Sequence, residues 1–235
     1  MLKVIATLLL ASAVAAALTV TASARTERVA RTQRLAVVLT AHTARSAPDL
    51  HAAAVQVVSP TTPLTHERTI LPVLGKARGR QGAVWLRVRL PGRPNGHAGW
   101  IKEQGTRSAR TNWSILVDLR DRHVTVFRSA VPTKTFPVVI GRPSAPTPSG
   151  WFFVEESLRI VPGYAGGPYA LALSARSNVY SEFDGGPGQI AFHGVYGIGG
   201  TPGTAVSHGC VRVGSADMAW LGEHIRQGVP VHIVA

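Results

Sequence analysis

Residues 113–128, WSILVDLRDRHVTVFR, contain two short runs in which every second side chain is apolar. Ile115, Val117 and Leu119 alternate with other residues in the first run, and the charged triplet RDR separates it from HVTVFR at 123–128. Alternation with a period of two is typical of strands with one buried face, and a short turn between two such runs predicts a hairpin. We therefore expect this part of the chain to be built from β-strands.

The strand pattern continues to the end of the chain and is interrupted by one helix. Further strand-like runs are TFPVVIG at 135–141, WFFVEE at 151–156, GQIAFHG at 188–194 and VPVHIV at 229–234. Residues 215–228 instead place Met218, Leu221 and Ile225 on one helical face, with Ser215 as the expected N-cap. The predicted fold class is mainly β, a sandwich or barrel with a C-terminal helix.

A smaller all-β module is expected upstream of this domain. The run VWLRVRL at 84–90 alternates in the same way, PGRPNG at 91–96 is rich in turn residues, and GWIK at 99–102 begins another strand. This pattern resembles bacterial SH3-like modules. An apolar patch at 35–41, within an arginine-rich stretch, could be a short strand or a helical turn.

The first residues have the composition of a secretory signal. Lys3 precedes an apolar run from Val4 to Val20, and Ala22, Ser23 and Ala24 offer a small-residue cleavage site. We expect cleavage after Ala24 and export, with an uncleaved membrane anchor as the alternative. The predicted segments are a signal peptide at 1–24, a basic lead-in at 25–51, the small module at 52–106, a linker at 107–112 and the main domain at 113–235.

The chain is basic, with 25 Lys and Arg residues against 12 Asp and Glu residues and a formal net charge of +13. For an exported protein, the polyanions within reach are wall polymers rather than nucleic acid. Anionic wall polymers are therefore possible partners, and no nucleic acid partner is expected. A basic protein with no particular partner is the alternative, and no obligate protein partner is predicted.

The single cysteine, Cys210, lies in the stretch AVSHGCVRVG at 205–214. Exported cysteines usually form disulfides, and a lone cysteine has no partner within its own chain. Its neighbours His208 and Gly209 are poor core-filling residues, which favours a reactive thiol over a buried inert one. A thiol nucleophile needs a base within reach, and both His208 and His193 are candidates.

These residues carry a specific resemblance. His193 in FHG, followed by the thirteen residues 194–206 and then by SHGCVRV, resembles the active-site signature of L,D-transpeptidases, exported enzymes that cross-link peptidoglycan. VVIGRPSAPTPSGWFFV at 138–154 resembles their segment with a TPxG turn, so the resemblance covers residues 113–235. The family implies that Cys210 is the nucleophile and that His193 takes its proton.

The resemblance also implies roles for the neighbouring residues. The backbone carbonyl of Gly194 would orient the His193 ring. His208 and Gly209 would shape the site, with backbone N–H groups near Cys210 as the oxyanion hole.

Substrate contacts would come from Arg212, Ser207 and Tyr196. Arg212 stands where many members carry asparagine. A flap over the donor would span residues 156–188, with Tyr164, Tyr169 and Tyr180.

The reaction implied by the family is acyl transfer in two steps. The cysteine would attack the third residue of a peptidoglycan tetrapeptide stem and expel the terminal D-alanine. The amine of a second stem would then resolve the thioester and form a 3→3 cross-link. This chemistry needs no metal and no diffusible cofactor, and the family implies that carbapenems acylate the same thiol.

The same residues admit different interpretations. A zinc site built from His193, His208 and Cys210 would lack a fourth protein ligand. Glu155 and Glu156 are adjacent in a predicted strand and should point to opposite faces, one toward solvent, so they do not form a glycosidase pair. A structural turn at Cys210, a hydrolase on the same scaffold and a non-catalytic wall-binding protein also stay open.

Overall fold

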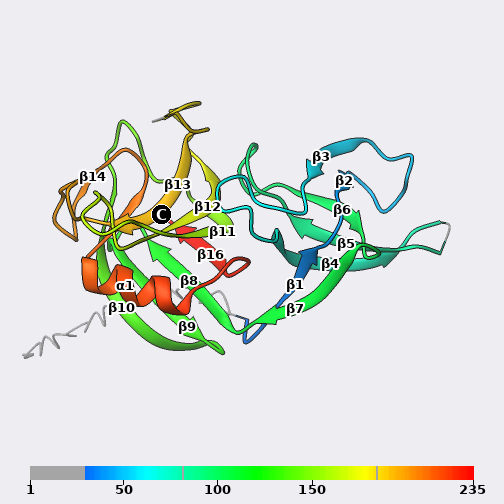
Figure 1. Ribbon diagram of the computed structural model, residues 1–235, viewed down its shortest axis with the longest axis horizontal. Helices are drawn as coiled ribbons and strands as arrows, with labels where there is room; N and C mark the ends of the chain where they lie inside the picture. The colour runs from blue at the N-terminus through cyan, green and yellow to red at the C-terminus, as the bar shows by residue number, and fades with distance from the viewer. Residues whose placement is uncertain (1–29, 81, 184) are drawn as a thin grey trace, which may run out of the picture.

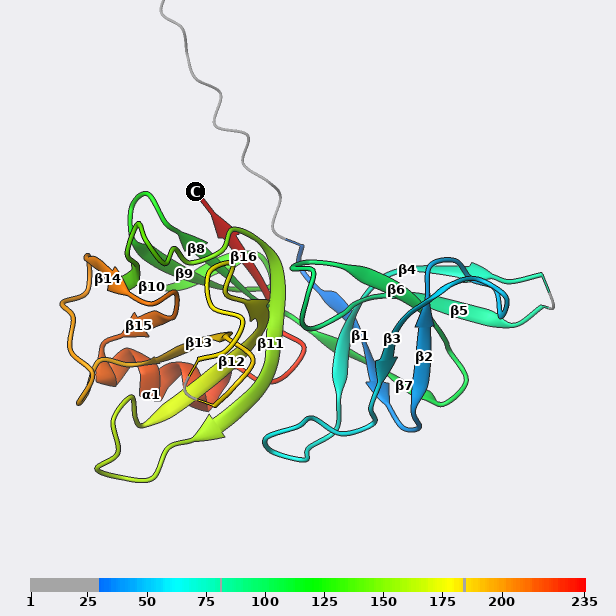
Figure 2. The same cartoon turned by 90° about the horizontal axis from the view of Figure 1, so that it is seen from above.

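The computed structural model describes residues 30–80, 82–183 and 185–235. Two lobes lie side by side, one formed by the strands up to residue 111 and the other by the rest of the chain (Figures 1 and 2). The predicted signal peptide at 1–24 lies outside the described residues. Within the described ranges, no helix is long and apolar enough to span a membrane.

The first lobe, here called the N-terminal module, is one antiparallel seven-stranded sheet in the order β3-β2-β6-β5-β4-β1-β7. Its strands are β1 (Gln33–Val38), β2 (His42–Arg45), β3 (Ala54–Val58), β4 (Ile70–Arg78), β5 (Val84–Arg89), β6 (Ala98–Lys102) and β7 (Thr106–Thr111). Val38, Leu71, Val88 and Ile101 fill its core. Along β5 the predicted alternation places Leu86 and Val88 in this core, and Trp85 is also buried but lies outside the core cluster.

Two predicted boundaries are wrong. The stretch 25–51 is not a lead-in throughout, because β1 and β2 lie within it and pair with the middle of the sheet. The stretch 107–112 is not a linker, because β7 occupies most of it and pairs along its whole length with β1. Both stretches are rich in arginine, which conceals the strand pattern, since exposed strand positions tolerate any polar residue.

The second lobe, the C-terminal domain, is a closed sheet with the order β14-β10-β15-β13-β12-β11-β16-β8-β9. Its strands are β8 (Trp113–Asp118), β9 (His123–Arg128), β10 (Val131–Gly141), β11 (Gly150–Arg159), β12 (Tyr169–Arg176), β13 (Gln189–Gly194), β14 (Ala205–Ser207), β15 (Val211–Val213) and β16 (Pro230–Val234). The predicted hairpin is confirmed as β8 and β9. A further pairing between β9 and β10 closes the ring, so the mainly β, barrel-like fold class is also confirmed.

The helix α1 (Ser215–His224) packs against the sheet over β11, β12 and β13. Met218, Leu221 and Ile225 are fully buried, as their spacing predicted. The N-cap is Gly214 and not Ser215, and no side chain caps the first turn. Asp217 in that turn pairs with Lys134 at 2.9 Å, and its charge suits the positive end of the helix dipole.

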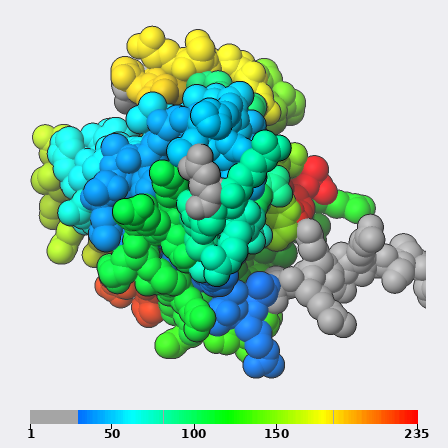
Figure 3. Space-filling model, turned by 90° about the vertical axis from the view of Figure 1, so that its right-hand side faces the viewer, coloured from blue at the N-terminus to red at the C-terminus, as the bar shows by residue number. Residues whose placement is uncertain are grey.

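The two lobes share a packed interface. Phe153 of β11 belongs to the core cluster of the N-terminal module, although the rest of its strand lies in the C-terminal domain. The carboxylate of Glu156 accepts hydrogen bonds from the backbone N–H groups of Leu64 (3.1 Å) and Thr65 (2.8 Å). Seen from the side of the N-terminal module, the segment around residues 177–188 (yellow) runs along the top of that module (Figure 3).

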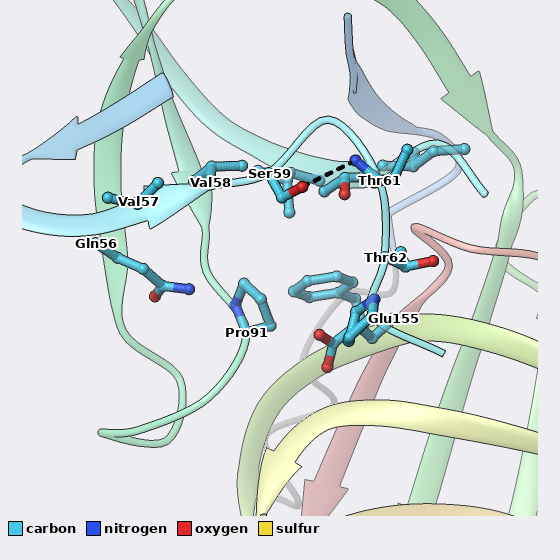
Figure 4. A pocket seen from close by; sticks show the side chains of 13 residues that line it. Gln56, Val57, Val58, Ser59, Thr61, Thr62, Pro91 and Glu155 are labelled. Atoms are coloured by element: carbon cyan, nitrogen blue, oxygen red, sulfur yellow. Dashed lines mark hydrogen bonds between the residues drawn. The ribbon is translucent and has the colours of Figure 1, made fainter. Parts of the chain in front are cut away.

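A cavity of about 140 Å³ lies at this interface, where the module meets β11. Figure 4 shows Pro91 of the module and Glu155 of β11 on the same side of this cavity. Glu155 and Glu156 are both buried, because a bulge between Val154 and Glu156 breaks the alternation of β11. The prediction that one of them faces solvent is therefore wrong.

Candidate active site

Cys210 and His193 lie on neighbouring parallel strands. The register of β13 against β15 places Phe192 opposite Val211 and His193 opposite Arg212. Phe192 and Val211 are fully buried in the core, so alternation puts His193, Arg212 and Cys210 together on the other face. The parallel pairing thus brings together two residues that are 17 positions apart in the sequence.

The thiol is presented by a tight turn, here called the nucleophile turn (residues 207–210). The Ser207 side chain is fully buried. Its hydroxyl donates to the carbonyl of Cys210 at 2.6 Å and accepts from the N–H of Gly209 at 3.1 Å. Ser207 is therefore a turn residue, and its expected contact with substrate stays a prediction.

Gly209 adopts φ +122°, a conformation that side chains disfavour, and a Cβ there would lie 3.0 Å from Ile190 Cδ1. The buried hydroxyl of Thr147 donates to the Gly209 carbonyl at 2.8 Å and accepts from the N–H of Gly141 at 2.9 Å. In a trans peptide the C=O and N–H point in opposite directions. Because Thr147 binds the Gly209 carbonyl, the backbone N–H of Cys210 in the same peptide unit points away from Thr147.

Sequence reasoning gave Thr147 no role, although the PTPSG segment around it was singled out as part of the resemblance. The sequence signal was the presence of Thr147 in this segment at a fixed distance from the signature around Cys210. Thr147 and Gly209 are 62 residues apart, and only the folded sheet brings them into contact. Gly209, in contrast, was expected at the site because glycine permits close backbone approach. Its own N–H is occupied by Ser207, so it is not available as an oxyanion donor.

The His193 ring is oriented by its own strand and covered by a loop. Its Nδ1 lies 3.0 Å from the carbonyl of Gly194, which assigns the Nδ1–H tautomer and leaves Nε2 as the acceptor. The N–H of Gly194 donates to the carbonyl of Gly166 at 2.6 Å. A Cβ on Gly166 would lie 3.5 Å from His193 Nδ1, so the loop between β11 and β12 packs directly on the imidazole.

Burial sets the protonation states of both groups. It lowers the pKa of His193 below 6.5, a shift that the hydrogen bond to Gly194 opposes and the charge of Arg212 reinforces. Burial raises the pKa of the Cys210 thiol above 9.0, although a backbone hydrogen bond at Ala191 and the same Arg212 act in the opposite direction. The resting pair is therefore a neutral imidazole and a neutral thiol, and the thiol lies 3.9 Å from the Gln189 carbonyl.

His208 does not share the position of His193. Its ring packs against two aromatic residues of the loop between β12 and β13, with centroid distances of 6.0 Å to Tyr180 and 5.5 Å to Phe183. These three rings form a wall beside Cys210, called the aromatic wall below. The predicted flap at 156–188 is not one segment, because β12 divides it into two loops and holds Tyr169 against the core.

Arg212 lies in β15, and Tyr196 lies in the loop that follows β13. Arg212 donates from Nη1 to the carbonyl of Gly199 at 3.1 Å, and its buried Nε has no hydrogen-bond partner among the described residues. The Tyr196 side chain is 56% exposed, while its carbonyl accepts from the N–H of Gly166 at 2.7 Å. Both residues are thus placed where a bound peptide could reach them.

Groups able to hold a metal are not found among the described residues, in which no three His, Cys, Asp or Glu side chains converge suitably. The donor set around the thiol offers instead a base, a nucleophile and backbone N–H groups. This combination can perform acyl transfer through a covalent intermediate.

Residues 112–233 match the family described as the L,D-transpeptidase catalytic domain. The chain belongs to the L,D-transpeptidase family. Members of this family are associated with the cell wall and act on the peptide stems of peptidoglycan. The match begins at the residue before β8 and ends within β16, so it covers the whole C-terminal domain and excludes the N-terminal module.

Solved L,D-transpeptidases are similar to this chain at low identity. A mutant of the Enterococcus faecium L,D-transpeptidase is 21% identical with a TM-score of 0.40, covering 52% of this chain and 49% of its own. The L,D-transpeptidase from Mycobacterium smegmatis is 16% identical with a TM-score of 0.40, covering 68% and 98%. L,D-transpeptidase 3 from Mycobacterium tuberculosis, in complex with a faropenem-derived adduct, is 15% identical with a TM-score of 0.46, covering 71% and 91%.

The chain spans about half the length of the Enterococcus faecium chain. No curated protein matches it.

Proposed function

We propose that this protein is a peptidoglycan L,D-transpeptidase that forms 3→3 cross-links through a thioester on Cys210. The observation that carries the proposal is the placement of Cys210 and His193 on one face of the parallel pair β13 and β15, with the Nδ1 of His193 held by the Gly194 carbonyl. This geometry leaves Nε2 as the basic atom on the same face as the thiol.

The first half-reaction consumes a donor tetrapeptide stem. Cys210 Sγ attacks the carbonyl carbon of the third residue while its proton passes to His193 Nε2. The tetrahedral intermediate then collapses, and the bond to the terminal D-alanine breaks. The departing amine takes the proton from His193, which leaves a thioester and a neutral imidazole.

The second half-reaction regenerates the thiol. The side-chain amine of the third residue of another stem attacks the thioester and loses a proton to His193. Collapse forms the new amide, and Cys210 leaves and recovers that proton. In both halves the developing oxyanion would be stabilised by the N–H of Cys210, which the bond from Thr147 to Gly209 orients. Neither half uses a metal or a diffusible cofactor.

Two rival functions use the same fold. If water resolves the thioester, the protein is an L,D-carboxypeptidase, and the difference lies in water exclusion and acceptor access. If the fold only binds the wall, the complete pair of thiol and oriented imidazole has no use. The presence of that pair favours an enzyme.

The decisive experiment incubates the protein with tetrapeptide muropeptides and follows both enzyme and products by mass spectrometry. We expect an acyl adduct on the wild type, none on Cys210→Ala, and a 3→3 dimer among the products. An adduct that decays only to tripeptide would assign the carboxypeptidase. A folded wild-type protein that forms neither adduct nor product would contradict both enzymatic assignments.

A second proposal concerns export and attraction to the wall. We infer that the protein is exported, on the basis of the signal-like first 24 residues, and that the N-terminal module meets anionic wall polymers there. On the outer face of its sheet, Trp100 stands directly opposite both Arg45 and Arg87 in the two neighbouring strands. No carboxylate among the described residues pairs with either arginine.

A tryptophan with an arginine opposite it in each neighbouring strand suits a polymer that carries anionic groups on sugar units. We expect binding to purified anionic wall polymer to weaken as salt is raised and to weaken further in the Arg45→Ala/Arg87→Ala double variant. Salt-insensitive binding that is equal in the two proteins would contradict this part of the proposal.

A further inference from the structure

We infer that the N-terminal module positions one side of the active site, because its β5–β6 loop (residues 90–97) holds the β12–β13 loop (residues 177–188) that carries the aromatic wall. The structural part of this inference stands on its own. Its consequence for donor binding rests on the proposed transpeptidase function. The family match begins at residue 112, after the module. The inference therefore concerns residues outside the family's domain.

Arg93 is the main link between the two loops. Its guanidinium donates to three backbone carbonyls of the β12–β13 loop: Pro187 at 3.0 Å, Ser177 at 2.9 Å and Tyr180 at 2.8 Å. These carbonyls come from both ends and the middle of the loop. A planar fork with several donors is the side chain best suited to such a three-point contact, and a charged donor strengthens each bond.

Asn95 adds a second link at the base of the same loop. Its side-chain amide accepts from the N–H of Arg176 at 2.8 Å and donates to the carbonyl of that residue at 2.7 Å. It also donates to Asn178 Oδ1 at 3.0 Å. In addition, the N–H of Gly92 donates to the carbonyl of Ser174. The β5–β6 loop therefore forms hydrogen bonds with backbone N–H and C=O groups at the end of β12, as a neighbouring strand would.

The loop held in this way carries two of the three rings of the aromatic wall. Tyr180 is fixed at both ends, since Arg93 binds its carbonyl and Arg142 donates to its hydroxyl at 3.2 Å. Within the described part of the loop, the remaining hydrogen bonds are local. The N–H of Ser177 donates to the carbonyl of Gly188, and the Ser177 hydroxyl accepts from the N–H groups of Val179 and Tyr180. Phe183 and Gly186 exchange backbone bonds. These bonds fix the base of the loop, so the position of its tip depends on the contacts from outside the loop.

A buried chain of contacts continues from the same anchor toward the thiol. Arg176, whose backbone Asn95 holds, pairs with the carboxylate of Glu155 at 3.1 Å. Gln189 donates to the same carboxylate oxygen at 2.9 Å, and the carbonyl of Gln189 is the group 3.9 Å from Cys210 Sγ. The module thus supports the strand that lies against the nucleophile as well as the wall beside it.

The expected consequence is a defect in donor binding with the chemical groups left in place. Cys210 and His193 are held by β13, β15 and the nucleophile turn, none of which Arg93 touches. Loss of Arg93 should therefore loosen Tyr180 and Phe183 while the thiol and its base keep their relative position. Arg93 is in this sense a positioning residue.

The structural test compares backbone hydrogen exchange in the wild type, Arg93→Ala, Arg93→Lys and a control, Arg78→Ala. Arg78 is an exposed arginine at the end of β4, and no hydrogen bond or ion pair of its side chain is found among the described residues. In Arg93→Ala we expect the backbone amides at 177–183, 185, 186 and 188 to exchange about tenfold faster or more, because several charge-assisted bonds are lost. The Lys variant should resemble the Ala variant, since an ammonium cannot reach all three carbonyls, and the control should match the wild type.

The functional test measures acylation of Cys210 by tetrapeptide donor over a range of donor concentrations, beside alkylation of the same thiol by iodoacetamide. We expect the half-saturating donor concentration to rise about tenfold in Arg93→Ala, with the limiting acylation rate and the alkylation rate changed less than about threefold. A purely structural weakening of the fold would instead lower the limiting acylation rate and raise the alkylation rate, because the buried thiol would become exposed.

Unchanged exchange of the β12–β13 loop in a folded Arg93→Ala protein would overturn the clamp itself. Full recovery in Arg93→Lys would overturn the three-point contact. Faster exchange with unchanged donor binding would overturn the role of the wall in the active site. If the wild type is not acylated at all, the proposed function fails, and the exchange measurement still decides the clamp.

Discussion

The nucleophile turn and the β12–β13 loop flank the same thiol but are held in place in different ways. The turn is fixed from within the C-terminal domain by Ser207 and Thr147, two buried hydroxyls that each bridge two backbone groups. The loop is fixed from the other lobe by Arg93, an exposed residue whose contacts lie 84 to 94 positions away in the sequence.

The difference separates reactivity from recognition. The groups that break and form bonds are supported by buried hydrogen bonds within the C-terminal domain, whose loss costs more than that of exposed ones. The surface beside them is supported across a domain interface that can vary without disturbing the chemistry. Substitutions that affect the nucleophile turn should therefore lower the rate of the chemical step. Substitutions that affect the β12–β13 loop should change donor binding.

The largest effect is expected from the base. In His193→Gln the thiol stays in place but its proton has no acceptor, so the rate of acylation should fall by about 10²–10⁴-fold at neutral pH. The measurement is single-turnover acylation at saturating donor, followed by mass spectrometry.

The matched control for this variant is His123→Gln, which changes a histidine of β9 whose Nδ1 contacts only the backbone of Asp121. Its acylation rate should equal that of the wild type. A His193→Gln protein that acylates normally would show that another group, such as His208, accepts the proton.

The pH profile tests the neutral resting pair. Because the pKa of His193 lies below 6.5, acylation should decline only as the pH falls below that value, when the imidazole becomes protonated. Because the pKa of the Cys210 thiol lies above 9.0, the rate should stay level from about pH 7 to 9. In the same range iodoacetamide, which needs the thiolate, should react faster with each step in pH.

Alkylation that is already maximal at pH 6 would contradict this picture. It would mean that the resting pair is a thiolate and an imidazolium. The nucleophile turn would then have to contain a stronger positive charge than Arg212 to stabilise the thiolate.

A smaller effect is expected at Thr147, the residue that holds the turn from a distance. Thr147→Val keeps the shape but leaves the Gly209 carbonyl and the Gly141 N–H without their buried partner, which should cost about 1–3 kcal/mol of unfolding free energy. The limiting acylation rate should fall about tenfold, with donor affinity little changed. Urea unfolding and acylation kinetics on the same samples measure both quantities.

Thr135→Val serves as the control, since its hydroxyl is exposed and bonds only to Thr125. The comparison is contradicted if Thr147→Val changes donor affinity and Arg93→Ala changes the limiting rate. The nucleophile turn would then govern donor binding, and the β12–β13 loop would govern the chemical step.

Much of the C-terminal domain could be predicted from its sequence because its signals are local. The hairpin at 113–128, the helical face of Met218, Leu221 and Ile225, and the spacing of His193 from Cys210 are all confirmed as features of the fold. The roles of Cys210 and His193 in catalysis stay predictions.

The errors have physical causes that lie outside any local pattern. Strand β7 was missed because its residues are almost all polar, and only pairing with β1 makes it a strand. Strand β1 was left open between a strand and a helical turn, because its apolar run at 35–38 is too short for its period to decide. Glu155 and Glu156 were misplaced because a bulge changes the facing of β11. The resemblance of the upstream module to SH3-like modules stays a prediction.

By itself, the sequence determined the β-rich class and the closing helix, since alternation and helical periodicity are written into neighbouring residues. The pairing of Cys210 with His193 follows from the family resemblance and stays a prediction. Only the tertiary structure decided that Ser207 and Thr147 build the nucleophile turn and that Arg93 supports the aromatic wall. The physical reason is that Thr147 and Arg93 bond to backbone groups 62 and 84 to 94 positions away in the chain, while the local bonds of Ser207 depend on the positive φ of Gly209. A polar side chain shows its partner only after the sheet has brought that partner within hydrogen-bonding distance.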